Sequence, residues 1–382
     1  MGKFKIIRSA TVPLSLKTFL NGSVESLMNK YDLVLLSSPG KELDDLHNKY
    51  GVRTIGIHME RRISLIKDIR SLWKLIRIFR EEKPHMVHSM TPKAGLLCML
   101  AAKLTGVPKR VHTFTGLVWP TATGIRKKIL MLTDKILCAC ATNIIPEGEG
   151  VKNDLQTHIT NRPMRVLGYG NVRGVDMNYW RMTEQIIARS VELQKELELV
   201  NTFTFVFIGR LVGDKGINEL VEAFCQLYKY NQNVRLLLIG PTEEDLDPIN
   251  SETWDKINNN SSIIEVGPVW GDALLSYYAL SDCFVFPSYR EGFPNTVLEA
   301  GAMGLPSIVT DINGSREIII DGQNGLIVPP KDISALYIAM GRMVNDANMY
   351  QRMSSNARIM VETRFEQGFV RQCLLEYYDE IM

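Results

Sequence analysis

Two carboxylates that lie eight positions apart, Glu291 and Glu299, are the most informative residues of this chain. They belong to residues 281–301, SDCFVFPSYREGFPNTVLEAG, which predict a buried strand, a loop and then a helix that begins after the turn 292–295. The backbone N–H groups at a helix N-terminus bind anions, whereas carboxylates accept hydrogen bonds from hydroxyl groups. The segment therefore predicts a ligand with phosphate in its middle and polyols at both ends, as in a nucleotide-sugar.

Two cations follow another predicted strand in residues 203–224, FTFVFIGRLVGDKGINELVEAF. Arg210 comes directly after Gly209, and Lys215 precedes a helix. At the carboxyl end of a strand this pair could clamp a diphosphate, Arg as a bidentate donor and Lys as a point charge. The loop is not a Walker loop, since G-x-x-x-x-G-K-[ST] is absent. The alternative is that both cations belong to a solvated surface.

Two weaker signals lie between these segments. The strand predicted in IIEVGPVW, residues 263–270, could present its backbone at Gly267 to Val269 to a flat base. Asp245 and Asp247 form a D-x-D pattern that is typical of metal sites elsewhere, but an acidic solvated loop is the favoured interpretation here. We expect no bound metal and no cofactor apart from the donor substrate.

These segments must be positioned by strands that alternate with helices, which is the pattern of parallel α/β sheets. We predict helices over 15–30, 62–83, 93–106, 124–141 and 149–157 in the first half. The predicted strands are Phe4–Arg8, Leu33–Ser37, Val52–Ile57, Met86–Ser89, Arg110–Phe114, Asn143–Pro146, Met164–Leu167, Thr204–Gly209, Val234–Gly240, Ile263–Val266, Cys283–Pro287, Ser307–Thr310 and Leu326–Pro329.

The expected architecture is two doubly wound, Rossmann-like parallel-sheet domains that face each other across a cleft. We place the first domain at 1–172, a linker at 173–200 and the second domain at 201–364. Ligands in such sheets bind at the carboxyl ends of the strands.

Charge is divided between the two halves. Residues 1–180 carry 28 Lys and Arg against 14 Asp and Glu, whereas residues 181–382 carry 16 against 28. A basic half attracts phosphates, anionic lipid or nucleic acid; chance drift of surface charge is the alternative. The six cysteines form no C-x-x-C pair, which favours reduced thiols in a cytoplasmic protein. We find neither a signal peptide nor an apolar run long enough to span a membrane.

With these motifs the chain resembles the family 4 glycosyltransferases, retaining enzymes of the two-Rossmann (GT-B) architecture. GRLVGDKG at 209–216 and PSYREGFPNTVLEA at 287–300 carry the resemblance, and GNVRGVDMNYW at 170–180 is similar to an interdomain element of the family. The resemblance implies that the C-terminal helix, 365–382, packs back on the first domain. It also assigns the donor diphosphate to Arg210 and Lys215, the donor sugar to Glu291, the ribose to Glu299, and sugar and phosphate contacts to the backbone of Phe293, Pro294, Asn295 and Thr296.

The first half departs from the family pattern. Members usually carry a glycine pair after the first strand, where this chain has Ser9 to Pro13 without glycine, and often a His where this chain has Thr115. His112, three residues earlier, is either the catalytic replacement or a satisfied strand histidine.

Other polar residues of the first half are expected at the carboxyl ends of its strands. We expect His88, Thr91 and Lys93 to face the cleft, with Lys93 either at an acceptor diphosphate or at a surface. Glu147 or Glu149 either binds an acceptor hydroxyl or caps a helix.

Residues 88–117 resemble the subgroup that builds capsular, O-antigen and other lipid-linked oligosaccharides, which implies a polyprenyl-diphosphate-linked acceptor. Residues 61–83 hold eight basic and three acidic residues with apolar positions at helical spacing. Such a helix packs on the sheet, lies on an anionic membrane, or does both. We therefore expect a peripheral protein on the inner face of the plasma membrane.

The predicted function is transfer of a hexose or N-acetylhexosamine from a UDP-sugar, with retention. The alternatives are an isomerase like UDP-N-acetylglucosamine 2-epimerase and a non-catalytic subunit that binds sugar nucleotides. Nucleic-acid binding is not expected, because no basic motif with interleaved aromatic residues occurs.

Overall fold

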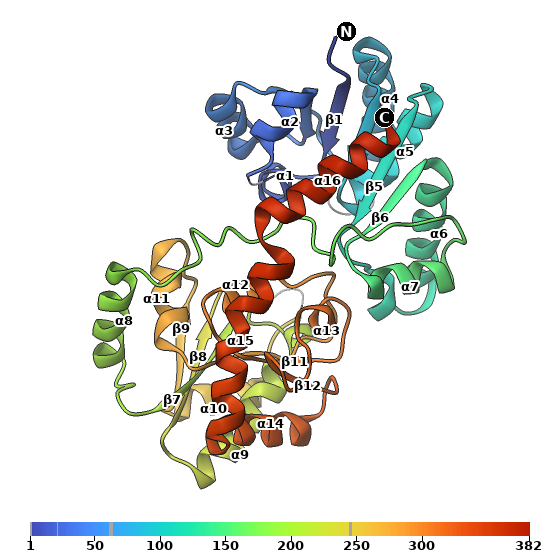
Figure 1. The fold of residues 1–382 in the computed structure, drawn as a ribbon. Coiled ribbons are helices and arrows are strands. Elements are labelled where there is room, and N and C mark those ends of the chain that lie inside the picture. Colours follow the sequence, from blue (N-terminus) through green and yellow to red (C-terminus); the bar gives the residue numbers. More distant parts are fainter. Residues whose placement is uncertain (1, 21, 61–63, 244–246) are drawn as a thin grey trace. The chain divides into compact units, whose positions relative to one another are not determined.

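The computed structural model describes residues 2–20, 22–60, 64–243 and 247–382. The chain divides into two compact units, Met1–Gly174 with Gln367–Met382, and Val175–Glu366 (Figure 1). Each unit is built on a six-stranded sheet in which all pairs of neighbouring strands are parallel. The predicted α/β class with two doubly wound sheets is therefore confirmed.

The first sheet has the strand order β3-β2-β1-β4-β5-β6. Its strands are β1 (Lys5–Ser9), β2 (Asp32–Ser37), β3 (Arg53–Gly56), β4 (Met86–Ser89), β5 (Lys109–Phe114) and β6 (Asn143–Pro146). Most of their residues are buried, as expected for a parallel sheet that is covered on both faces.

Helices cover both faces of the first sheet, and each face has its own apolar core. The helices of one face are α1 (Pro13–Phe19), α2 (Val24–Lys30), α3 (Lys41–Tyr50) and the C-terminal α16 (Gln367–Ile381). The helices of the other face are α4 (Leu65–Glu82), α5 (Pro92–Leu104), α6 (Gly124–Cys140) and α7 (Glu149–His158), with the short η1 (Trp119–Thr121) before α6.

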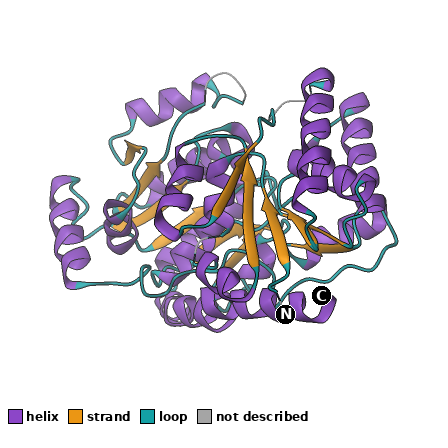
Figure 2. Cartoon of the chain, turned by 90° about the horizontal axis from the view of Figure 1, so that it is seen from above, coloured by secondary structure: helices purple, strands orange, loops and turns teal. Residues whose placement is uncertain are grey.

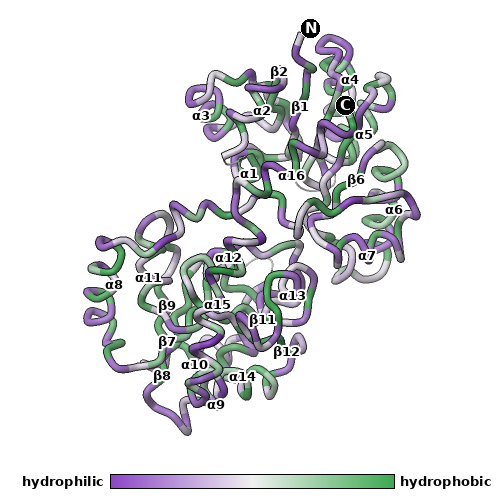
Figure 3. The backbone as a smooth tube through the Cα atoms, viewed as in Figure 1, coloured by the Kyte–Doolittle hydropathy of each residue, from purple (hydrophilic) through white to green (hydrophobic). Residues whose placement is uncertain are grey.

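The second sheet has the strand order β12-β11-β10-β7-β8-β9. Its strands are β7 (Phe203–Ile208), β8 (Val234–Ile239), β9 (Ile263–Gly267), β10 (Cys283–Phe286), β11 (Ser307–Thr310) and β12 (Gly325–Val328). Its helical elements are α8 (Glu184–Glu196), η2 (Gly213–Lys215), α9 (Ile217–Tyr230), α10 (Ser251–Asn259), α11 (Asp272–Leu280), α12 (Asn295–Ala302), α13 (Ser315–Ile318), α14 (Ile333–Asn345) and α15 (Ala347–Phe365). Figure 2 shows the strands enclosed by helices, and Figure 3 shows apolar stretches along many of the strands.

Twelve of the predicted strands are present with ends within one residue of the prediction. The prediction was wrong for Met164–Leu167, which forms a loop beyond β6. The helix predicted over 15–30 is two helices, α1 and α2, since Gly22 between them has a positive φ of 70° that interrupts a helix. The linker predicted at 173–200 is not a separate segment, because residues 175–200 belong to the second unit, where α8 packs against α11.

The C-terminal helix α16 is held on the first sheet by a buried polar network. Arg8 Nη1 donates to the hydroxyl of Tyr378 at 2.9 Å, and that hydroxyl also hydrogen-bonds His88 Nδ1. His88 Nε2 in turn lies 2.7 Å from Thr113 Oγ1. The network ties β1, β4 and β5 to the end of the chain, so residues far apart in sequence share one core.

In the second sheet the loops after β7 and β10 touch. These strands are neighbours, and Gly216, with φ 73°, approaches the loop so closely that a Cβ would lie 2.2 Å from the carbonyl oxygen of Pro287. Tyr289 N–H donates to Asp214 O at 2.9 Å, and Arg290 forms an ion pair with Asp214 at 3.3 Å. The two loops therefore form one rigid surface.

We expect Gly216→Ala to destabilise the protein more than Gly322→Ala. Both glycines have almost the same positive φ, 73° and 75°, and each substitution costs roughly 1–2 kcal/mol for the left-handed backbone. At Gly322 nothing lies within 4 Å of the added Cβ, whereas at Gly216 the loops must move apart. Denaturant unfolding of both variants measures the difference; equal losses would contradict the close contact.

Candidate active site

The predicted donor residues lie on both sides of a topological switch point. In the second sheet the chain proceeds from β7 through β8 to β9 in one direction and from β10 through β11 to β12 in the other. Ligands of open α/β sheets bind at the carboxyl ends of the strands at such a point. Lys215 follows β7, and Glu291 follows β10.

Lys215 and Glu291 form an ion pair between Nζ and Oε1, although they are 76 positions apart in sequence. Both side chains are largely buried, and Ser288 Oγ donates to the same carboxylate oxygen at 2.9 Å. The ammonium group also lies 5.3 Å from the ring centre of Phe286 at the end of β10. The structure thus brings together the residues predicted to bind the diphosphate and the sugar.

Arg210 has a different position. Its side chain is 49% exposed and forms an ion pair with Glu243, in the loop after β8. Its backbone is fixed by Leu211, which pairs with Thr242 across the same two loops. Arg210 therefore lies at the carboxyl edge of the sheet with its guanidinium group directed toward β8.

The loop between β7 and α9 is anchored by Asp247. The Asp247 carboxylate accepts a hydrogen bond from Asp214 N–H at 2.6 Å, and its carbonyl accepts one from Gly213 N–H at 3.0 Å. Asp247 is a half-exposed loop residue, and its carboxylate in addition accepts a backbone N–H group of a tight turn. Asp245, the other member of the D-x-D pattern, lies outside the described residues.

Helix α12 begins at Asn295, directly after the loop that carries Glu291. Pro294 occupies the N-cap position and makes no side-chain capping bond, while Phe293 is buried against Phe365 at 5.4 Å between ring centres. Asn295 and Thr296 are half-buried, and Glu299 is buried one turn into the helix. This is the helix N-terminus that the spacing of the two glutamates predicts.

Gly267 ends β9 with a positive φ of 78°, and its carbonyl accepts a hydrogen bond from Gly240 N–H at 3.0 Å. Val269 is half-buried and is followed by the exposed Trp270. The predicted base-binding segment therefore follows β9, the edge strand next to β8, on the side of the sheet toward which Arg210 is directed.

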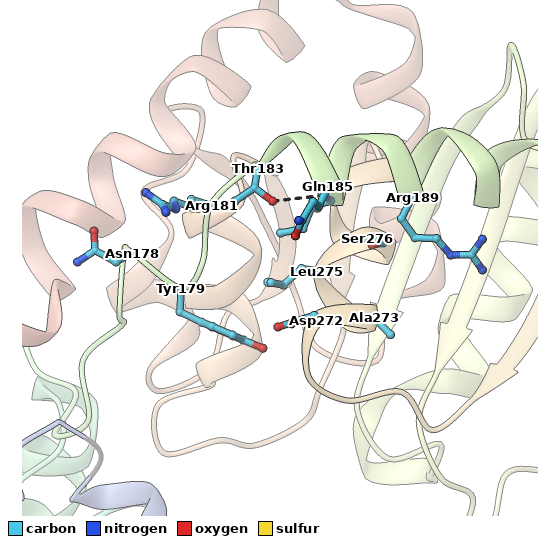
Figure 4. Close-up of a pocket in the computed structure, with 11 residues that line it drawn as sticks. Asn178, Tyr179, Arg181, Thr183, Gln185, Arg189, Asp272, Ala273, Leu275 and Ser276 are labelled. Carbon is cyan, nitrogen blue, oxygen red and sulfur yellow. Dashed lines mark hydrogen bonds between the residues drawn. The ribbon is translucent and has the colours of Figure 1, made fainter.

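Sequence reasoning missed an open pocket in the second unit, of about 390 Å³, which lies between α8 and the start of α11 and is lined by polar and apolar residues (Figure 4). Tyr179 and Asp272 line it, and the Tyr179 hydroxyl points toward Asp272. Burial, then Asp272, then the charge of Glu299 raise the pKa of Tyr179. Tyr179 thus lies near the carboxylate predicted to bind ribose; its signal was its place in the segment 170–180, which the family resemblance already included.

In the first unit, threonine hydroxyls bridge the corresponding switch point between β1 and β4. Thr11 N–H donates to Thr91 Oγ1 at 2.8 Å, and Ala94 N–H at the start of α5 donates to Thr11 Oγ1 at 3.2 Å. Lys93, one position earlier, forms an ion pair with Asp68 of α4. Thr11 thus occupies the place where the family pattern has glycine.

His112 is buried in the core and hydrogen-bonded, as its interpretation as a satisfied strand histidine expects. It is 1% exposed in β5, shares a 2.8 Å hydrogen bond between Nδ1 and Ser89 Oγ, and packs edge-on against Phe114. Gly95 of α5 lies so close that a Cβ there would be 2.4 Å from the imidazole. Burial lowers the pKa of His112 to about 3, so the ring is neutral.

The expectation that His88 faces the cleft was wrong, since it is buried in the network with Tyr378. Glu147 is buried as well, and Glu149 pairs with Lys152 at 2.9 Å in the first turn of α7. Thr115 is half-buried and donates to Met90 O at 3.2 Å. Among the described residues, no group of three or more His, Cys, Asp and Glu side chains is arranged to hold a metal ion.

Comparisons with known proteins agree with this geometry. Residues 189–360 match the family model of glycosyl transferases group 1, and residues 12–147 match that of glycosyl transferase 4-like proteins. The capsular polysaccharide biosynthesis glycosyltransferase CapM of Staphylococcus aureus is 32% identical over 99% of this chain and 97% of its own length. This chain belongs to the family 4 glycosyltransferases. It is therefore an enzyme that transfers sugars.

Two further similarities support the assignment. A UDP-Gal:alpha-D-GlcNAc-diphosphoundecaprenol alpha-1,3-galactosyltransferase of Escherichia coli is 30% identical over 85% of this glycosyltransferase and 81% of its own length. The crystal structure of Anabaena Alr3699/HepE in complex with UDP superposes with a TM-score of 0.81 over 99% of this chain and all of that chain, at 16% identity. The structural likeness shows a common fold.

We expect His112→Gln to weaken the acid dependence of stability. The unfolded histidine, with a pKa near 6.5, takes up a proton below that pH, whereas the folded one does not until about pH 3. Through this residue the free energy of unfolding therefore falls by on the order of 2 kcal/mol between neutral pH and about pH 5. Denaturant unfolding at both pH values measures the loss in each protein.

The matched control is His58→Gln, because His58 is exposed. This variant should keep the acid dependence of the wild-type protein. An unchanged profile in His112→Gln would show that the buried imidazole titrates normally, contrary to its position in β5.

Proposed function

We propose that this glycosyltransferase moves a sugar from a UDP-sugar to a polyprenyl-diphosphate-linked saccharide, with retention of configuration, in cell-surface polysaccharide synthesis. The observation that carries the proposal is the contact of Lys215 with Glu291 at the switch point of the second sheet. In the proposed site Lys215 binds the leaving diphosphate, and the neighbouring Glu291 accepts hydrogen bonds from the sugar hydroxyls. The name of the Escherichia coli relative supports the donor and acceptor classes, and the name of the Staphylococcus aureus relative supports polysaccharide synthesis.

In the proposed reaction the bond between the anomeric carbon and the β-phosphate oxygen breaks, which leaves negative charge on the diphosphate. Lys215, Arg210 and the N-terminus of α12 at Asn295 stabilise that charge. Preorganised charges of this kind usually supply the largest catalytic term. The acceptor hydroxyl attacks from the face that the diphosphate leaves, and the departing phosphate takes its proton.

Binding requires two adjustments of the side chains. A diphosphate at Lys215 competes with Glu291 for the ammonium group, which frees the carboxylate to accept hydrogen bonds from sugar hydroxyls. Arg210, half-exposed and paired with Glu243, has to turn from the β8 loop toward the phosphates. The partly exposed ion pair of Arg210 with Glu243 stabilises the protein by about 1 kcal/mol or less, so breaking it costs little free energy.

The sugar is an N-acetylhexosamine in our proposal. A further relative, an N,N'-diacetylbacillosaminyl-diphospho-undecaprenol alpha-1,3-N-acetylgalactosaminyltransferase of Campylobacter jejuni, is 21% identical over 94% of both chains. We also propose that no metal is required, because the cations of the second unit and the start of α12 supply the charge that a metal would. A 2-epimerase is not favoured, since two of the few histidines, His88 and His112, are buried.

We further propose that the enzyme acts at the inner face of the plasma membrane. No helix of the described residues could cross a bilayer by its length and apolar character. Helix α4 instead presents Arg70, Lys74 and Arg77 on its exposed face. Each basic residue near an anionic surface contributes about 1 kcal/mol of attraction.

Lys215→Ala and Arg210→Ala should each lower turnover about 10²-fold or more, as loss of one preorganised donor does. Transfer from UDP-N-acetylhexosamines to a polyprenyl-diphosphate-linked saccharide is the assay. Lys256→Ala is the matched control. This lysine also forms ion pairs, with Glu222 and Glu252, but it lies on α10 and is not part of the proposed site. Turnover of either site variant within a fewfold of the control would remove that residue from the mechanism.

UDP should stabilise the protein, by roughly 2.7 kcal/mol at 100 times its Kd, both with and without EDTA. Glu299→Gln should reduce this stabilisation, because the amide is a weaker acceptor for ribose hydroxyls. Thermal shift with UDP and UDP-sugars measures it. A shift that disappears in EDTA would show that nucleotide binding needs a metal, and epimerisation without acceptor would support an isomerase.

A further inference from the structure

Helix α6 carries an exposed apolar stripe that the sheet does not use. Ile125, Ile129, Leu132 and Ile136 are 78%, 43%, 57% and 37% exposed. Their spacing of four, three and four residues places them on one line along a helix. The opposite side of the same helix packs into the core through Leu137 and Cys138. The stripe is therefore a second apolar face, which a helix that only covers a sheet does not need.

Helix α4 has a similar second face. Leu65, Ile66, Ile69 and Trp73 are each more than half exposed, while Leu75, Ile76 and Phe79 of the same helix are buried in the core. Figure 3 shows apolar and polar residues alternating along the first unit's helices. In both helices the exposed apolar residues lie mainly in the first half.

The two stripes lie on the same face of the first sheet and at the same end. Helix α5 packs against both α4 and α6, and all three contribute to one core cluster. The ion pair between Asp68 and Lys93 joins the first turn of α4 to the first turn of α5. Helices that follow parallel strands begin at the carboxyl ends of those strands. The exposed apolar residues are thus grouped around the edge that carries Lys93.

Basic residues flank the apolar stripes. Exposed members on α4 are Lys67, Arg70, Lys74, Arg77 and Arg80, and exposed members on α6 are Arg126, Lys128 and Lys135. The acidic residues of these helices are paired or partly buried: Asp68 pairs with Lys93, Glu81 with Arg77 of the same helix, Glu82 with Lys5 and Arg53, and Asp134 is half-buried. The surface of α4 and α6 therefore combines two apolar stripes with basic residues on either side of them.

We propose that α4 and α6 together dock the first unit on an anionic lipid bilayer, with Ile125, Ile129 and Leu132 inserted among the acyl chains near the headgroups. The inference deepens the proposed function, since it adds α6 as a second anchor and sets the carboxyl edge of the first sheet against the lipid. A bilayer fits this surface better than a second copy of the chain, because a symmetric contact would set like charges against each other. Basic amphipathic helices bind anionic interfaces through burial of their apolar face and through electrostatic attraction to the lipids.

The consequence concerns the acceptor. Its diphosphate is attached to a lipid chain and lies at headgroup depth, so an edge held at that depth meets it without extracting it from the membrane. Lys93 is at this edge, where a diphosphate would compete with Asp68 for its ammonium group. The exposed stripes thereby determine which end of the first sheet receives the acceptor.

Flotation of the full chain with vesicles tests the proposal. The wild-type protein should float with vesicles of equimolar phosphatidylcholine and phosphatidylglycerol and bind phosphatidylcholine alone at least tenfold more weakly. The triple variant Ile125→Ser, Ile129→Ser, Leu132→Ser should lose tenfold or more of its affinity for the anionic vesicles. The matched control is Ile187→Ser, Val191→Ser, Ile359→Ser in the second unit, where the exposed fractions are 49%, 44% and 57%.

The control variant should float as the wild type does. Equal flotation of the α6 variant and the wild type would overturn the proposal, as would a wild-type dimer that the α6 substitutions dissociate without vesicle binding by either protein. Thermal shift with UDP separates this inference from the proposed function. The α6 variant should keep the full UDP shift, whereas failure of the wild type to bind UDP would refute the donor assignment and leave the vesicle result standing.

Discussion

The ion pair between Lys215 and Glu291 is the interaction on which the arrangement of the second unit's edge depends. Two opposite charges in a largely buried position are favourable if their geometry is fixed, since their desolvation has to be compensated. Here the geometry is fixed by contacts between the loops after β7 and β10, at Gly216 and Pro287 and at Asp214 and Tyr289. On the proposed function, this fixed frame holds the ion pair where a diphosphate and a sugar would bind to its two members.

The first unit uses polar residues differently. Arg8, His88 and Tyr378 are buried and bonded to one another, and His112 is a neutral member of the core. Burial disfavours the charged form of histidine, so these rings join strands and helices instead of moving protons. The polar groups at the carboxyl edge include the hydroxyls of Thr11 and Thr91, which bond to each other, and Lys93, which pairs with Asp68.

Much of this organisation could be predicted from local sequence patterns. Apolar runs of strand length, separated by helical stretches, located twelve strands to within a residue, since burial on both faces of a parallel sheet leaves little choice of residue type. The cations after β7 and the carboxylates around the start of α12 were found for a similar reason. Their chemistry is tied to strand ends, and strand ends are marked in the sequence.

Long-range contacts decided the rest. His112 is polar, lies near an expected catalytic position and alternates with apolar residues, so its local pattern fits an active-site residue and a core residue equally; the approach of Gly95 and Ser89 settles the question. Similarly, only the fold shows that Asp247 accepts a hydrogen bond from the turn at Asp214, and that Asp272 and Glu299 raise the pKa of Tyr179. Residue type and spacing define which chemistry is available to a chain. Burial and partners, which depend on segments far apart in sequence, decide which side chains are left to perform it.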